Sequence, residues 1–160
     1  MNIIKDWTVI KKHFSDSFKT SLHVSIASVN KNGAPAITPI GTLFLNDNQT
    51  GFYFEKFSSG LTDNIEKNNI VCVLAVNSSK FFWLRSLFYG KFKKHPALKL
   101  HGELGQKRKA TKEEIYALSR RMRATKRLKG NHYLWKNMAF VREVKFKDVE
   151  QIKLGKMMPF

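Results

Sequence analysis

The feature that most constrains the fold is a succession of short apolar runs between residues 22 and 76, separated by turn-forming residues. The runs at 22–29, 36–45, 51–57 and 70–76 have the length and the β-branched or aromatic content of strands. Asn30 to Gly33 predicts a hairpin turn, because glycine readily adopts the positive φ that such turns need. The polar stretch 58–65 predicts a short helix that begins beside the end of the third strand.

The remainder of the chain adds strands and helices of the same modest length. Residues 3–19 have the spacing of an amphipathic helix, and residues 97–105 and 138–147 alternate like strands, with a last short segment at 149–154. Thr111 to Glu114 forms a capping box, which predicts a helix that ends by Gly130. Pro39 lies inside the second run and marks an edge strand, a bulge or a strand that faces a ligand.

These elements predict one domain over residues 1–160, because most domains contain about 100–200 residues. Six or seven strands with three helices and mostly antiparallel turns indicate a mainly β protein with peripheral helices. We expect a small closed barrel rather than two stacked sheets, because closure removes exposed strand edges.

Composition limits the setting in which the chain works. Hydrophobic residues make up 42% of the sequence, which is enough for a substantial core. It has no run of about 18 apolar residues and no signal-peptide pattern at its start, so we expect no membrane partner and a cytoplasmic location. The single cysteine, Cys72, lies in an apolar strand and indicates a buried structural thiol rather than a nucleophile.

Positive charge is concentrated in the middle of the sequence. The net charge is +17, and the stretch from Lys80 to Gly130 holds 16 basic and 3 acidic residues. Such a field attracts nucleotides, phosphorylated cofactors, nucleic acid or acidic lipid. A basic surface that only aids solubility is the other interpretation of the same charge.

Motifs for residue-based catalysis are absent. The five histidines are scattered without pairs at helical spacing, so no metal site is predicted. The sequence has no nucleophile elbow, no P-loop, no dinucleotide glycine fingerprint and no readable pair of carboxylates. No catalytic residue is therefore predicted, and a cofactor that carries its own chemistry is the natural alternative.

Residues 54–64 have the composition of a phosphate site. Hydroxyl groups come from Ser58, Ser59 and Thr62, Gly60 permits close approach of the backbone, and Lys56 supplies a full positive charge. Simple N-capping of the helix by Ser59 or Thr62 explains the same residues. The residues alone leave both interpretations open.

The ordered set of segments resembles the pyridoxamine 5′-phosphate oxidase-like family of flavin-binding split β-barrels. The resemblance rests on residues 32–33, 36–40, 52–54, 59–65 and 69–73, followed by the strand at 98–104 and the capped helix from Thr111. It implies a six- to seven-stranded antiparallel split β-barrel that forms homodimers and holds FMN in clefts between the subunits. It also implies an FMN-dependent oxidoreductase that acts on a small-molecule substrate.

The resemblance also implies a set of cofactor contacts. The flavin ring would lie along Thr38, Pro39, Ile40, Gly41 and Thr42. The ring and the ribityl chain would be lined by Phe54, Glu55 and Lys56, and the phosphate by Ser58, Ser59, Thr62 and Asn64. Trp83 and Arg85 would reach the cleft from the partner subunit.

The chain departs from the family pattern at one point. Many relatives carry basic residues after the serine, where this chain has Gly60 and Leu61. The phosphate charge would then be met by Lys56, by Arg85 or by the basic segment 91–129. The substrate-recognition pattern of true pyridoxamine phosphate oxidases is not evident, so a vitamin B6 enzyme is not expected.

Two alternatives accompany this interpretation. Relatives that bind a deazaflavin or haem suggest another cofactor, with His101 or His23 as an axial haem ligand. A barrel that binds nucleic acid or another polyanion through residues 80–130 is the second. The aromatic stretch 81–89 favours core or dimer contacts over a stacking platform, and the arginines of the helix at 120–129 favour a solvated face.

Overall fold

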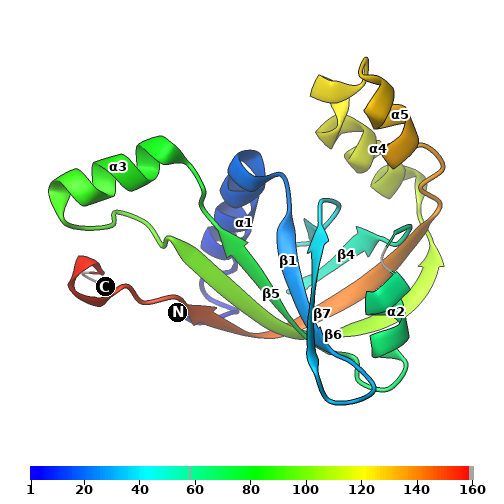
Figure 1. The fold of residues 1–160 in the computed structure, drawn as a ribbon, viewed down its shortest axis with the longest axis horizontal. Coiled ribbons are helices and arrows are strands. Elements are labelled where there is room, and N and C mark those ends of the chain that lie inside the picture. The colour runs from blue at the N-terminus through cyan, green and yellow to red at the C-terminus, as the bar shows by residue number, and fades with distance from the viewer. Residues whose placement is uncertain (58, 159–160) are drawn as a thin grey trace.

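The computed structural model describes residues 1–57 and 59–158, apart from the side chain of Ser59. Its strands form one antiparallel sheet with helices at both ends (Figure 1). The strands are β1 (Val24–Val29), β2 (Pro35–Ile40), β3 (Phe44–Leu45), β4 (Thr50–Phe54), β5 (Ile70–Val76), β6 (Ala97–Lys109) and β7 (Phe140–Gln151). The helices are α1 (Trp7–Ser21), α2 (Ser59–Ile65), α3 (Lys80–Tyr89), α4 (Lys112–Arg121) and α5 (Lys129–Trp135), with 3₁₀ turns η1 (Arg123–Thr125) and η2 (Gly155–Met157).

The connection between β2 and β3 forces the sheet to curl. The strand order is β2-β1-β5-β6-β7-β4-β3, so these two consecutive strands lie at opposite edges. A flat sheet of this order would separate its edges by six strand spacings, roughly 29 Å. Residues 41–43, which join them, can span only about 14 Å. The sheet therefore bends until its two edges approach each other at this loop.

The expectation of a closed barrel is wrong, whereas the mainly β class with peripheral helices is confirmed. In the described part of the chain, β2 pairs only with β1, and β3 pairs only with β4. Both edges are poor partners, because β3 has two residues and β2 contains Pro35 and Pro39, which lack an N–H donor. The gap between the edges thus stays open.

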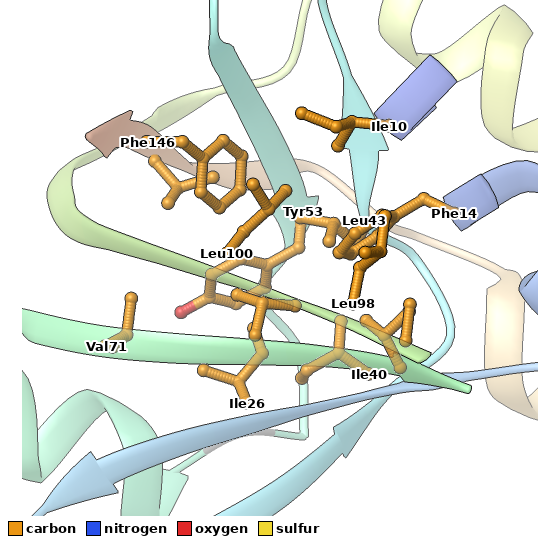
Figure 2. Close-up of a cluster of buried hydrophobic side chains, with 14 of the residues drawn as sticks. Ile10, Phe14, Ile26, Ile40, Leu43, Tyr53, Val71, Leu98, Leu100 and Phe146 are labelled. Carbon is orange, nitrogen blue, oxygen red and sulfur yellow. The ribbon is translucent and has the colours of Figure 1, made fainter. Parts of the chain in front are cut away.

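The main core fills the inside of the curl. Ile10 and Phe14 of α1 meet Ile26, Leu98 and Leu100 from the sheet (Figure 2). These side chains are almost fully buried, and burying each one stabilises the fold by about 1.5–3 kcal/mol. The predicted amphipathic helix is confirmed as α1, and its apolar stripe covers the concave side of the sheet.

A second, smaller core lies between α4 and the outer face of β4 and β7. Phe52, Phe54, Leu118, Met138 and Val141 form this cluster. Because β4 packs against a core on each face, every residue from Gly51 to Phe54 is buried. This double burial explains why the third apolar run shows no alternation in the sequence.

Arg121 fixes α4 to the connection between β2 and β3. Its guanidinium donates to the Leu43 carbonyl at 2.6 Å. It also lies 3.5 Å from the centre of the Phe44 ring and 4.4 Å from that of Phe18. Burial lowers the pKa of Arg121 to about 10, so the group remains charged at neutral pH and its contacts with both rings are cation–π interactions.

The predicted helices occur, with changes in their ends. The capping box at Thr111 and Glu114 is confirmed, but α4 ends at Arg121 and is followed by η1 and α5, which was not predicted. The aromatic stretch forms α3, with Ser79 as its N-cap and Gly90 in a left-handed C-cap. No helix among the described residues is long and apolar enough to cross a membrane.

Gly102 tests the close approach of β6 and β7. A Cβ at Gly102 would lie 2.4 Å from the Lys145 carbonyl oxygen, whereas one at Gly105 would meet its nearest neighbour at 3.5 Å. We expect Gly102→Ala to lower the free energy of unfolding by about 1–3 kcal/mol, because the strands must separate to admit the methyl group. Urea unfolding measures the change. Gly105→Ala is the control on the same strand, and equal stability of both variants would contradict this packing.

Candidate functional site

Most of the predicted cofactor-binding residues lie where the β2–β3 loop, the end of β4 and α2 meet. The Thr42 hydroxyl donates to the Phe54 carbonyl at 3.3 Å and accepts from the Phe54 N–H at 3.1 Å. These two hydrogen bonds hold the loop against the end of β4. The two bonds also satisfy the buried hydroxyl of Thr42.

Gly41 lies in a narrow space within the same loop. A Cβ built on it would be 3.3 Å from the Leu22 carbonyl and 3.5 Å from the Trp135 ring of α5. Of the neighbouring predicted residues, Thr38 is half-buried, Pro39 is exposed and Ile40 is buried in the main core. The loop therefore runs between the end of α1 and the end of α5.

A buried ion pair lies beneath α2. The Glu55 carboxylate accepts from Arg142 Nε at 2.9 Å and Arg142 Nη2 at 3.2 Å, and from the Thr62 hydroxyl at 2.5 Å. Arg142 also donates to the Gly105 carbonyl at 3.0 Å. These bonds tie the end of β4 to β7, to β6 and to α2.

The charge of Glu55 is compensated by its neighbours. Burial would raise the pKa of its carboxyl, but hydrogen bonds from Arg142 and Thr62 and the charges of Arg142 and Lys107 outweigh burial. The pKa of Glu55 therefore lies below its ordinary value, and the group is ionised at neutral pH. Lys107 of β6 is 3.5 Å from the carboxylate, so one negative charge faces two positive ones.

Tyr53 borders this ion pair from the core side. Its ring is fully buried, and its hydroxyl points among aliphatic side chains (Figure 2). Burial, with a smaller effect of the Glu55 charge, raises the pKa of the phenol well above its ordinary value, and Arg142 opposes the shift. Tyr53 is therefore neutral at neutral pH.

Lys56 is an exposed cation at the end of β4. Its ammonium donates to the carbonyl of Lys136 at 2.7 Å and to that of Tyr133 at 3.4 Å. It also lies 4.9 Å from the centre of the Phe57 ring. Lys56 therefore joins β4 to the end of α5, and its charge is at the surface beside the start of α2.

The remaining predicted phosphate contacts are partly engaged within the chain. Asn64 donates from its side-chain amide to the Ser28 hydroxyl at 3.0 Å, which attaches α2 to β1. Leu61 of the same helix is buried in the main core. Ser58 lies outside the described residues, and Ser59 is described only by its backbone, as the first residue of α2.

Trp83 and Arg85 are not brought to this site within one chain. They belong to α3, which lies at the far end of the long axis from α2 (Figure 1). Trp83 donates to the Asn77 carbonyl at 2.6 Å and packs against Phe92, and Arg85 stacks over Tyr89. A cofactor contact from either residue requires a second subunit and stays a prediction.

Sequence reasoning missed Arg142, Lys107 and Trp135. Arg142 stands opposite Tyr53 on one side and Lys107 on the other in the strand register. The only sequence signal is a basic residue at an inward position of an alternating strand, and the many other basic residues obscure it. Trp135 belongs to α5, a helix whose apolar residues do not recur at a clear helical spacing in the sequence.

A cavity of about 540 Å³ adjoins the site on the side of α4 and α5. Leu118, Met122, Trp135 and Met138 line it with apolar surface, and Lys126 adds a positive charge. Trp135 separates this cavity from the loop at Gly41.

The histidines of the described chain do not belong to a cluster of potential metal ligands. No group of three potential metal ligands occurs in the part of the chain that the structure describes. His101 Nε2 lies 3.3 Å from a Glu150 carboxylate oxygen, and His23 Nδ1 lies 2.8 Å from the Ser21 carbonyl. Both rings are accessible from the surface.

Comparisons with known proteins agree with this architecture. Residues 10–145 match the sequence profile of the family described as pyridoxamine 5′-phosphate oxidase. An FMN-binding protein of Syntrophomonas wolfei is 13% identical, with a TM-score of 0.62 over 94% of this chain and 90% of its own. HupZ of Group A Streptococcus is 15% identical, with a TM-score of 0.59 and coverage of 92% and 94%.

A further solved structure is the haem storage protein HutZ of Vibrio cholerae. It is 11% identical, with a TM-score of 0.54 over 88% of this chain and 93% of its own. No match was found among curated proteins. At these identities the solved structures establish the fold alone, and they confirm the predicted split β-barrel type.

The ion pair between Glu55 and Arg142 gives a pH-dependent prediction. Arg142→Met removes the bidentate partner of the buried carboxylate and leaves only Thr62 and Lys107 near it. We therefore expect a loss of about 3–5 kcal/mol in the free energy of unfolding at neutral pH. In the native protein the lowered pKa of Glu55 stabilises the fold above the ordinary value of 4.5, and this stabilisation is lost as pH falls through the folded-state pKa. In the variant, burial raises that pKa against only Thr62 and Lys107, because the contribution of Arg142 is lost, so the penalty shrinks at acidic pH.

Chemical denaturation at neutral and mildly acidic pH measures both effects. The control is Lys147→Met, which lies on the same strand as Arg142 and removes an exposed ion pair with Glu103. It should lower the free energy of unfolding by less than about 1 kcal/mol. A penalty for Arg142→Met that is the same at both pH values would contradict the assignment of the buried charge.

Proposed function

Because the chain belongs to the pyridoxamine 5′-phosphate oxidase family, we propose that it binds FMN where the β2–β3 loop, the end of β4 and α2 meet. The observation that carries the proposal is the spatial convergence of residues from three separate segments at this place. Thr42 bonds to Phe54, Glu55 bonds to Thr62, and Asn64 attaches the same helix to Ser28 of β1. The family match covers all three segments.

The charges at this place suit an anionic phosphate. Glu55 would repel a phosphate, but Arg142 and Lys107 more than neutralise it. Lys56 adds an exposed charge beside the start of α2. The immediate surroundings are therefore net positive, although Gly60 and Leu61 replace the basic residues that many relatives carry. An ammonium group with a free approach from solvent is the kind of donor that binds phosphate.

The residues of the chain would position the cofactor rather than react. FMN supplies hydride and electron transfer when it is bound. The backbone of residues 38–42 would lie along the flavin ring, and Lys56 would bind the phosphate. We propose an oxidoreductase that uses a reduced nicotinamide or another small organic substrate, with oxygen or another acceptor.

A homodimer with the cofactor between its subunits is part of the proposal. Two large apolar side chains at the edges of the site are strongly exposed: Ile37 of β2 at 71% and Phe57 at 67%. Exposed apolar residues of this size favour a partner that covers them. Ile37→Ser with Phe57→Ser should shift the protein from dimer to monomer in light scattering. The control is Tyr116→Ser with Leu128→Ser, and a dimer in both variants would contradict this interface.

Haem is the second candidate cofactor. The observation that favours it is the shared fold with the haem storage protein HutZ, together with an accessible His101 whose ring is oriented by Glu150. Polyanion binding through residues 80–130 is the alternative without a cofactor, and it predicts affinity that falls steeply with added salt.

An absorbance spectrum of the purified protein separates these candidates. After incubation with FMN and desalting, bands at about 370 and about 450 nm would support the flavin.

We then expect Lys56→Ala with Ser59→Ala to weaken FMN binding at least about tenfold, because hydrogen bonds to charged groups contribute about 1.5–3 kcal/mol. Fluorescence titration with FMN measures the affinity.

The matched control is Ser15→Ala with Lys153→Ala, which removes the same groups elsewhere. Unchanged FMN affinity in the Lys56 and Ser59 variant would refute the phosphate assignment. A colourless protein that rejects FMN but shows a Soret band with haem would favour the second cofactor. A Soret band that survives loss of both His101 and His23 would exclude these two ligands.

A further inference from the structure

Helix α3 presents an apolar face to solvent. Phe81, Leu84, Leu87 and Phe88 are exposed by 73%, 67%, 62% and 84% of their surface. Their spacing of three and four residues places them on one side of the helix. Single exposed apolar side chains are ordinary, but four neighbouring ones of this size mark an interaction surface.

The other side of α3 is held firmly in the fold. Ser86 is buried, Phe82 and Trp83 pack against the buried ring of Phe92, and Phe92 donates its N–H to the Met157 carbonyl at 2.8 Å. Both ends of the helix are capped. The exposed face is therefore a fixed surface, at the end of the molecule opposite α4 and α5 (Figure 1).

Basic side chains surround the same helix. A cavity of about 380 Å³ lies between α3 and the end of α1, and its basic lining residues are Lys19, Arg85, Lys91, Lys93 and Lys94. A cavity of about 350 Å³ next to it shares Lys93 and Lys94 and adds Lys12. Asp16 lines both cavities and pairs with Lys12 and Lys19.

The positive charges of the other four basic residues are not compensated by ion pairs among the described residues. Among the described residues, no carboxylate lies within salt-bridge distance of Arg85, Lys91, Lys93 or Lys94. Lys19 and Lys12 share the single charge of Asp16. The cavity beneath the apolar face is thus strongly positive and partly aromatic, because Phe81, Phe82 and Tyr89 also line it.

We propose that α3 docks the protein on the surface of an anionic phospholipid bilayer. The face of Phe81, Leu84, Leu87 and Phe88 would enter the boundary between headgroups and acyl chains, and the lysines beside it would bind lipid phosphates. A bilayer surface offers hydrocarbon and negative charge side by side, which is the combination that this end of the molecule presents. The proposal does not depend on the cofactor.

Other occupants match the surface less well. A second copy of the chain would bring the same uncompensated lysines toward one another, and like charges repel. Nucleic acid would bind the lysines but would leave the aliphatic residues of the helix exposed. The expectation of no membrane partner came from the lack of a spanning segment, and peripheral docking needs none.

Sedimentation with vesicles tests the proposal on the full chain. We expect binding to vesicles of phosphatidylcholine with phosphatidylglycerol, and little binding to phosphatidylcholine alone. Leu84→Ser with Phe88→Ser should weaken binding at least about tenfold, because each large apolar side chain contributes about 1.5–3 kcal/mol when buried. Both positions are exposed, so the variant should keep its unfolding midpoint.

A second pair of variants separates specific docking from general attraction. Lys91→Gln, Lys93→Gln and Lys94→Gln together should also abolish most binding, whereas Lys112→Gln, Arg123→Gln and Lys129→Gln remove equal charge at the opposite end and should not. Equal losses in both triple variants, or full binding by the Leu84 and Phe88 variant, would overturn the proposal. Conversion of a dimer to a monomer by that variant without vesicles would assign the face to a second copy instead.

Discussion

The connection of three residues between β2 and β3 determines the shape of the molecule. It joins the two outermost strands of a seven-stranded order, so the sheet cannot be flat. The curl that results encloses α1 and the main core on its inner side. It leaves a gap between two edges that cannot pair, and α2 packs beside this gap with Leu61 in the core. The candidate site lies at this gap because the connection, the end of β4 and α2 must meet there.

The ion pair of Glu55 and Arg142 sets the electrostatic character of that site. A buried carboxylate is costly unless it is paired and hydrogen-bonded, and Glu55 has both Arg142 and Thr62 as donors. Lys107 then leaves an excess of positive charge. The pair therefore joins three strands and a helix and also leaves the surroundings attractive to an anion. Breaking it would disturb the fold and the site together.

The fold divides the basic segment into two separate surfaces. In the sequence, residues 80–130 form one continuous block of positive charge. Strand β6 runs through this block and, with 13 residues, extends over about 43 Å. The lysines and the arginine near α3 therefore lie at one end of the molecule, and those of α4 and α5 lie at the other (Figure 1). The two ends differ in chemistry, because the first combines charge with an exposed apolar helix and the second adjoins the candidate cofactor site.

Local sequence patterns were sufficient to predict most of the helices and strands. Apolar runs, the turn at Gly33 and the capping box at Thr111 are local signals, so they predicted strands and helices close to those observed. The resemblance of the segments predicted the family, which the sequence profile confirms. The cofactor contacts around Thr42 and Glu55 stay a prediction. Contacts between distant strands become visible only in the folded chain. The open edge, the pairing of Glu55 with Arg142 and the exposure of α3 depend on register and curvature, which no local pattern encodes.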